Sequence, residues 1–84
     1  MESLEKIANI GKVLAEKLEK VGIHSEKELK ILGSEKAFLL IKEIDSKVTL
    51  SHLYALEGAV QGIRWFNLSE EKKKQLEMFF ELCR

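Results

Sequence analysis

Few side chains in this sequence are of the types that carry out catalysis. The 84 residues include two histidines, His24 and His52, and one cysteine, Cys83. A nucleophilic Cys–His pair needs the two side chains next to each other, and no spacing in the chain places Cys83 beside either histidine. Cys83 instead continues an apolar helical stripe, which favours a core thiol. Because a P-loop, a His-Glu-x-x-His motif and a paired-carboxylate site are also missing, we expect no enzymatic activity, no cofactor and no metal site.

The motif with the clearest chemical meaning lies near the amino terminus. Residues 4–18 predict a short helix, an Ile-Gly turn and a second helix, with Ala15 four residues after the glycine. This pattern resembles a helix-hairpin-helix unit, in which backbone N–H groups at the start of the second helix hold a nucleic-acid phosphate. The candidate DNA-binding or phosphate-binding residues are Asn9, Ile10, Gly11, Lys12 and Lys17.

Two features of the same segment favour a purely structural hairpin. The usual turn has two glycines around an apolar residue, and Asn9 takes the place of the first. Four glutamates are also interleaved with four lysines over residues 1–24, which dilutes the positive charge. DNA contact and a structural role therefore both stay open for this hairpin.

A second candidate site is the aromatic connector Ile63–Leu68. Arg64, Trp65 and Phe66 are its candidate partner-binding residues. Aromatic residues in such a connector can anchor the core, contact a protein partner or stack on a base, and we rank these readings in that order. Glu57 stands in an otherwise apolar segment about two helical turns before Arg64. Its carboxylate either points to solvent or pairs with Arg64, and we favour a structural ion pair over a functional acid.

Short helices must position these residues, because apolar side chains recur at helical spacing along most of the chain. We expect helices near residues 4–8, 12–21, 25–32, 34–44, 50–61 and 69–83, with a weak strand signal at 47–50. The expected helix ends are marked by N-terminal serines and C-terminal glycines: Ser25, Ser34, Ser69, Gly22, Gly33 and Gly62. The helix over 50–61 has the widest apolar face, so we place it at the centre, with Gly58 allowing close helix packing. The prediction is one all-α domain over residues 1–84, a compact bundle of five or six short helices with an N-terminal helix-hairpin-helix-like unit.

Composition excludes several function classes. Fourteen Lys and Arg balance fourteen Asp and Glu, which argues against a strongly basic coat protein and against a polyanionic mimic. The basic run Lys72–Lys74 is best interpreted as a solvated helix face. A single cysteine allows no intramolecular disulfide, the first residues lack the apolar core of a signal peptide, and no apolar run is long enough for a membrane span. We therefore expect a cytoplasmic protein that makes no membrane contact.

Three segments together resemble the C-terminal domain of the TfoX (Sxy) family of bacterial competence regulators. They are Ile10–Leu18 continued by Gly22–Ser25 and Leu29, then Leu53–Gly62, and finally Trp65 with Leu68 and the charged last helix. The resemblance covers about residues 4–80, and its most specific part is the Tyr-Ala-Leu-Glu-Gly-Ala segment from Tyr54 to Ala59.

The resemblance implies a role in bacterial DNA transformation. Proteins of this family promote expression of DNA-uptake genes together with a cyclic-AMP-dependent activator, and they bring no known catalytic residues. They usually carry another domain ahead of this one. This chain begins at Met1 without room for that domain, so we expect either a free-standing paralogue or an excised domain.

Two functional hypotheses follow. The first is a non-enzymatic module that assists transcription by contacting an activator protein, with weak DNA backbone contacts as a further possibility. The second is a structural or oligomerisation domain without nucleic-acid binding. In that case the apolar stripe Leu76, Phe79, Phe80 and Cys83 would continue into a homodimer face.

Overall fold

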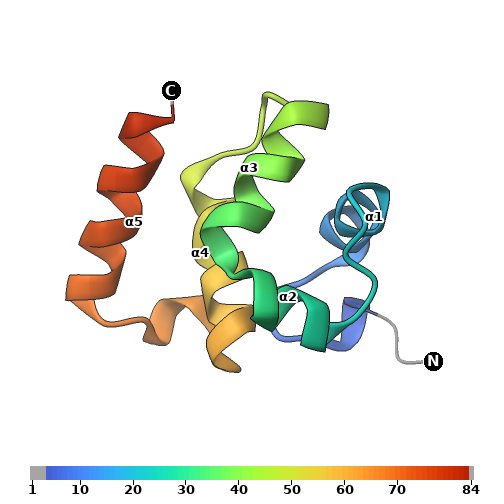
Figure 1. Ribbon diagram of the computed structural model, residues 1–84. Coiled ribbons are helices and arrows are strands. Elements are labelled where there is room, and N and C mark those ends of the chain that lie inside the picture. Colours follow the sequence, from blue (N-terminus) through green and yellow to red (C-terminus); the bar gives the residue numbers. More distant parts are fainter. Residues whose placement is uncertain (1–3, 84) are drawn as a thin grey trace.

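The computed structural model describes residues 4–83 and confirms an all-α bundle (Figure 1). No strand is present in this part of the chain. In chain order the elements are the 3-10 helix η1 (Leu4–Lys6), α1 (Lys12–Lys20), α2 (Glu26–Leu32), α3 (Ser34–Ile44), α4 (Leu50–Gln61), the 3-10 helix η2 (Trp65–Asn67) and α5 (Glu70–Leu82).

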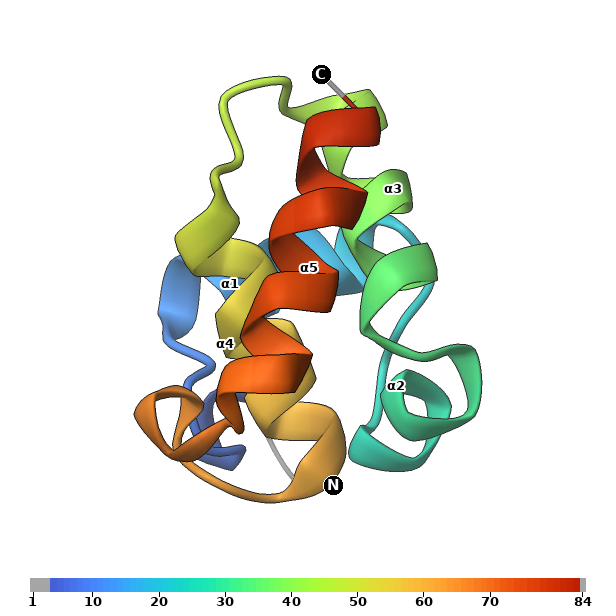
Figure 2. The same cartoon turned by 90° about the vertical axis from the view of Figure 1, so that its left-hand side faces the viewer.

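Helix α4 is the centre of the bundle, as its wide apolar face predicts. It packs against α2, α3, η2 and α5, and Figure 2 shows α5 running across the outer side of α4. Leu53, Leu56 and Ala59 of α4 are fully buried. The largest buried side chains around it come from four other helices: Leu18, Leu29, Phe38, Ile41 and Leu76. Since burial of each such side chain contributes about 1.5–3 kcal/mol, this cluster holds the bundle together.

Most helix ends lie where the capping residues predict. The Ser25 and Ser69 hydroxyls accept hydrogen bonds from the backbone N–H groups of Glu28 and Lys72, both at 3.1 Å. Gly62 ends α4 in the left-handed conformation at φ 76°, which costs glycine little because it has no Cβ.

Two local predictions are wrong. The expected first helix is only the single 3-10 turn of η1, so the helix-hairpin-helix assignment of this unit stays a prediction. The weak strand signal at 47–50 does not lead to a strand, as the all-α prediction requires, because residues 47–49 form a loop that buries Val48. Ser34 does not cap α3, because Gly33 occupies the N-cap position and Ser34 is already the first helical residue. Within residues 4–83 no helix has the length and apolar character needed to cross a lipid bilayer.

Candidate nucleic-acid and partner-binding surface

The hairpin, residues 9–12, leads directly into the first turn of α1. Asn9 has φ 72°, a left-handed conformation that asparagine tolerates better than most residues. Gly11 then adopts an extended backbone as the N-cap and supplies no side-chain cap to the helix. Gly11, Lys12 and Val13 are all exposed. An exposed first turn without a side-chain cap leaves backbone donors for an anion at the positive end of the helix.

The side chain of Asn9 forms two hydrogen bonds with a part of the chain that is distant in sequence. Its Nδ2 donates to the carbonyl oxygen of Ile63 at 2.8 Å, and its Oδ1 accepts from the backbone N–H of Trp65 at 3.0 Å. The backbone of Asn9 thus shapes the turn, while its amide ties the hairpin to the segment between α4 and η2. We call this pair of hydrogen bonds the Asn9 clamp.

Gly58 makes the clamp possible, which confirms that this glycine serves close packing. A Cβ at position 58 would lie 2.4 Å from Asn9 Nδ2, 2.9 Å from the Ile63 oxygen and 3.1 Å from the Trp65 nitrogen. Any side chain would therefore collide with the groups that form the clamp.

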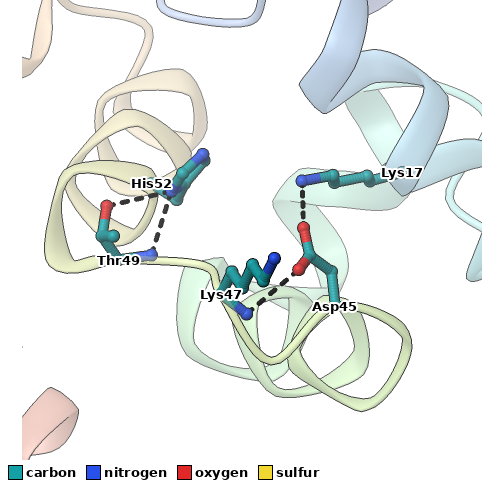
Figure 3. Close-up of polar contacts among 5 residues, drawn as sticks. All are labelled: Lys17, Asp45, Lys47, Thr49 and His52. Atoms are coloured by element: carbon teal, nitrogen blue, oxygen red, sulfur yellow. Dashed lines mark hydrogen bonds and ion pairs between the residues drawn. The ribbon is translucent and has the colours of Figure 1, made fainter.

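The two candidate lysines of the hairpin region have different environments. The Lys17 ammonium forms an ion pair with Asp45, at the end of α3, and both side chains are mostly buried (Figure 3). No ion pair of Lys12 is found within residues 4–83. The structure therefore places Lys12 at the hairpin as an exposed cation, whereas the charge of Lys17 is paired with Asp45.

His52, in the first turn of α4, lies close to the loop that carries Asp45 (Figure 3). His52 Nδ1 accepts a hydrogen bond from the Thr49 backbone N–H at 3.0 Å, forming a capping box that sequence analysis missed (Figure 3). Burial and the Lys17 charge lower the pKa of His52, and Asp45 opposes this only in part. Hydrogen bonds from Lys17 and from the Lys47 backbone lower the pKa of Asp45. His52 therefore favours its neutral, accepting form in the folded protein.

Arg64, Trp65 and Phe66 form an exposed aromatic corner. Trp65 is 45% exposed and Phe66 is 59% exposed, so the prediction that they anchor the core is wrong. The Tyr54 and Trp65 rings are stacked, with centroids 6.2 Å apart, and Phe66 meets Trp65 edge-on at 5.9 Å. These rings, Arg64, Asn9 and Ser51 line a hollow of about 310 Å³. The clamp thus places the hairpin and the aromatic corner side by side, although they are far apart in sequence.

Glu57 does not pair with Arg64, which corrects the predicted ion pair. The carboxylate is buried and accepts hydrogen bonds from the Ser34 hydroxyl and the Gln61 amide, both at 2.6 Å. The Ser34 side chain points to this acid because the α3–α4 packing brings the two together. Glu57 is therefore a structural residue of the bundle interior.

The predicted apolar stripe of α5 packs against the core of the domain. Leu76 is buried, and Phe79 and Phe80 pack against the core, with the Phe80 ring edge-on to Phe38 at 6.0 Å. Cys83 is half-buried and free. The stripe is thus largely covered by the domain itself. No group of three or more His, Cys, Asp or Glu side chains within residues 4–83 is arranged to hold a metal ion.

A family model and a relative of known name point to the same protein family. The sequence model of the TfoX C-terminal domain matches residues 1–80. Protein Sxy from Escherichia coli (strain K12) is 33% identical over 75 residues, an alignment that covers 89% of this chain and 36% of Sxy.

Two crystal structures of uncharacterised Listeria monocytogenes proteins have the same fold. The triclinic form is 54% identical with a TM-score of 0.96, covering 98% of this chain and 93% of that chain. The tetragonal form is 54% identical with a TM-score of 0.94, covering 96% of this chain and 99% of that chain. Together with the family match over nearly its whole length, these relatives show that the chain belongs to the TfoX C-terminal domain family.

Proposed function

We propose that this domain is a non-enzymatic, cytoplasmic regulatory module that assists transcription of competence genes. In this proposal the hairpin contacts the DNA backbone and the aromatic corner contacts a transcriptional activator protein. Membership of the TfoX family supports a competence-related regulatory role. The chain spans 36% of the length of Sxy, so the proposal concerns what this domain contributes.

The observation that carries the DNA contact is the exposed start of α1 at residues 11–13. It follows a turn fixed by Asn9, has no side-chain cap and presents Lys12 without an ion pair in the described chain. Backbone N–H groups at such a helix start, together with one cation, are suited to a single phosphate. Because the net charge is zero, we expect weak binding through one or two phosphates, with log K falling by about 1–2 per tenfold rise in salt.

Fluorescence anisotropy of a labelled DNA duplex, titrated with the domain at low and moderate salt, tests this contact. Lys12→Glu is expected to weaken binding and reduce the salt slope by about one. Lys74→Glu is the matched control, because it makes the same charge change at an exposed position of α5. This helix lies on the opposite side of the bundle from α1 (Figure 1). Equal loss of affinity in the two variants would show that only overall charge matters and would exclude the hairpin as the contact.

One observation favours an oligomerisation domain as the second candidate function. Met78 and Leu82 on the outer side of α5 are 69% and 85% exposed and line a shallow hollow of about 530 Å³ with Lys74 and Glu77. Exposed apolar residues of this kind mark interaction surfaces when they are grouped. Sedimentation over a concentration series decides this candidate: a monomer at all concentrations removes it, and a dimer that is lost in Met78→Lys supports it.

A further inference from the structure

The hollow at the aromatic corner has the features of a preformed binding pocket. One wall is the Trp65 ring, which is stacked on Tyr54 with an angle of 4° between the ring planes. Phe66 forms a second wall, at 82° to Trp65. A side chain entering the hollow would therefore meet aromatic surface on two sides.

The backbone of the corner is fixed by hydrogen bonds and by a buried leucine. Backbone hydrogen bonds close η2, from Asn67 N–H to the Arg64 oxygen at 2.9 Å and from Leu68 N–H to the Trp65 oxygen at 3.1 Å. Leu68 is buried and anchors the segment, and the Asn9 clamp fixes its start. The rings are thus exposed on a rigid backbone, an arrangement that reduces the entropy lost on binding.

The polar groups around the hollow select the charge of the ligand. Arg64 is exposed on the rim, and no ion pair of Arg64 is found in the described part of the chain. A guanidinium pairs best with a carboxylate or a phosphate. Burial raises the pKa of the Tyr54 hydroxyl, and the nearby carboxylates of Glu77 and Glu70 raise it further. Both acids lie outside the lining of the hollow and disfavour a polyanion in its neighbourhood, whereas a single carboxylate can pair with Arg64, the charged group of the lining.

From this arrangement we infer that the aromatic corner binds a peptide segment of a protein partner in which an aromatic or large aliphatic side chain lies next to a carboxylate. The apolar side chain occupies the hollow lined by Trp65 and Phe66, and the carboxylate pairs with Arg64. This inference deepens the proposed partner contact and rests on it, but it does not depend on DNA binding by the hairpin.

The minimal probe of this chemistry is N-acetyl-L-phenylalanine, which combines one aromatic ring with one carboxylate. Its amide, N-acetyl-L-phenylalaninamide, has the same ring without the charge and is the matched control ligand. Trp65 is the only tryptophan of the chain, so its indole N–H signal in an NMR titration reports directly on the hollow. We expect saturable shifts, with the acid binding about threefold to fivefold more tightly than the amide, as for an exposed ion pair.

Two variants test which residue of the hollow binds the carboxylate of the ligand and which binds its ring. Arg64→Gln is expected to remove the preference for the acid while leaving binding of the amide unchanged. Phe66→Ala is expected to weaken binding of the acid and of the amide alike. Because the Phe66 side chain is exposed, we expect this variant to fold. The inference is overturned if neither probe shifts the indole signal at tens of millimolar, or if the acid and the amide bind equally well.

Two further measurements separate this inference from its alternatives. Thymidine 5′-monophosphate supplies a base and a phosphate, and tighter binding of this nucleotide than of the acid would show a nucleic-acid site instead. DNA affinity is expected to be unchanged in Phe66→Ala, whereas Lys12→Glu should weaken it. Probe binding without any effect of Lys12→Glu on DNA would refute the hairpin contact and retain the peptide pocket.

Discussion

Replacing Gly58 by alanine should destabilise the domain, although the same change stabilises most helices. At an open helical site alanine is favoured over glycine by about 1 kcal/mol. Here the new methyl would lie 2.4 Å from Asn9 Nδ2 and 2.9 Å from the Ile63 oxygen. One of these contacts involves backbone, which cannot move aside by changing a rotamer.

The expected size follows from the groups that must shift. Disrupting the two hydrogen bonds of the Asn9 clamp costs about 2 kcal/mol, at about 1 kcal/mol each. Overpacking adds about 1–3 kcal/mol, and the helix propensity of alanine offsets about 1 kcal/mol. We therefore expect Gly58→Ala to lower the free energy of unfolding by about 2–4 kcal/mol. Urea denaturation followed by Trp65 fluorescence measures this value.

Asn9→Gly provides the matched control, because glycine adopts the positive φ of position 9 and carries no side chain to collide with residue 58. Alone it should cost about 2 kcal/mol through loss of the clamp. In combination with Gly58→Ala the total cost should be smaller than the sum of the two single costs, since the clamp is lost only once. An increase in stability of Gly58→Ala, or strict additivity in the double variant, would refute the reasoning.

Three further predictions concern other parts of the domain. The lowered pKa of His52 means that its neutral form stabilises the fold fully above about pH 6.5 and that this contribution is lost as the pH falls through the folded-state pKa. Urea titrations at pH 7 and pH 5 should therefore show a smaller acid-induced loss in His52→Gln, where glutamine keeps the capping box without titrating; an unchanged loss would contradict this role. Ser34→Ala should cost about 1–3 kcal/mol by removing a hydrogen bond to the buried Glu57 carboxylate, and the same change should cost much less in a Glu57→Ala background; equal costs in both backgrounds would exclude the coupling. Phe66→Ala should change thermal stability by less than about 0.5 kcal/mol because the ring is exposed, whereas Leu68→Ala should cost about 2–5 kcal/mol; a large effect of Phe66→Ala would restore the core-anchor reading.

The secondary structure could be predicted well wherever local signals act. Helix α4 has the bounds Leu50–Gln61 that its apolar spacing and Gly62 predict. Ser25 and Ser69 are N-caps, as predicted, since each hydroxyl accepts a hydrogen bond from the backbone N–H three residues later. The prediction for Ser34 failed because its hydroxyl had two possible partners, the helix N–H groups or a distant acid, and only the packing of α3 on α4 decides between them.

The candidate surface was predictable in part. Its residue types are visible in the sequence, and Asn in place of a turn glycine was a signal of a left-handed backbone. The second role of Asn9 was hidden, because its partners Ile63 and Trp65 lie 54 and 56 residues away. For the same reason spacing could not reveal that Lys17 is engaged by Asp45 while Lys12 remains exposed.

The sequence by itself determined that the chain forms short helices, where most of them begin and end, and to which family it belongs. These properties depend on apolar spacing and capping groups that act over three or four residues. Only the tertiary structure decided that the hairpin is tied to the aromatic corner, that Glu57 bonds to Ser34 and that Trp65 remains half-exposed. Those outcomes depend on which helix faces meet, because packing brings together groups that no local rule relates.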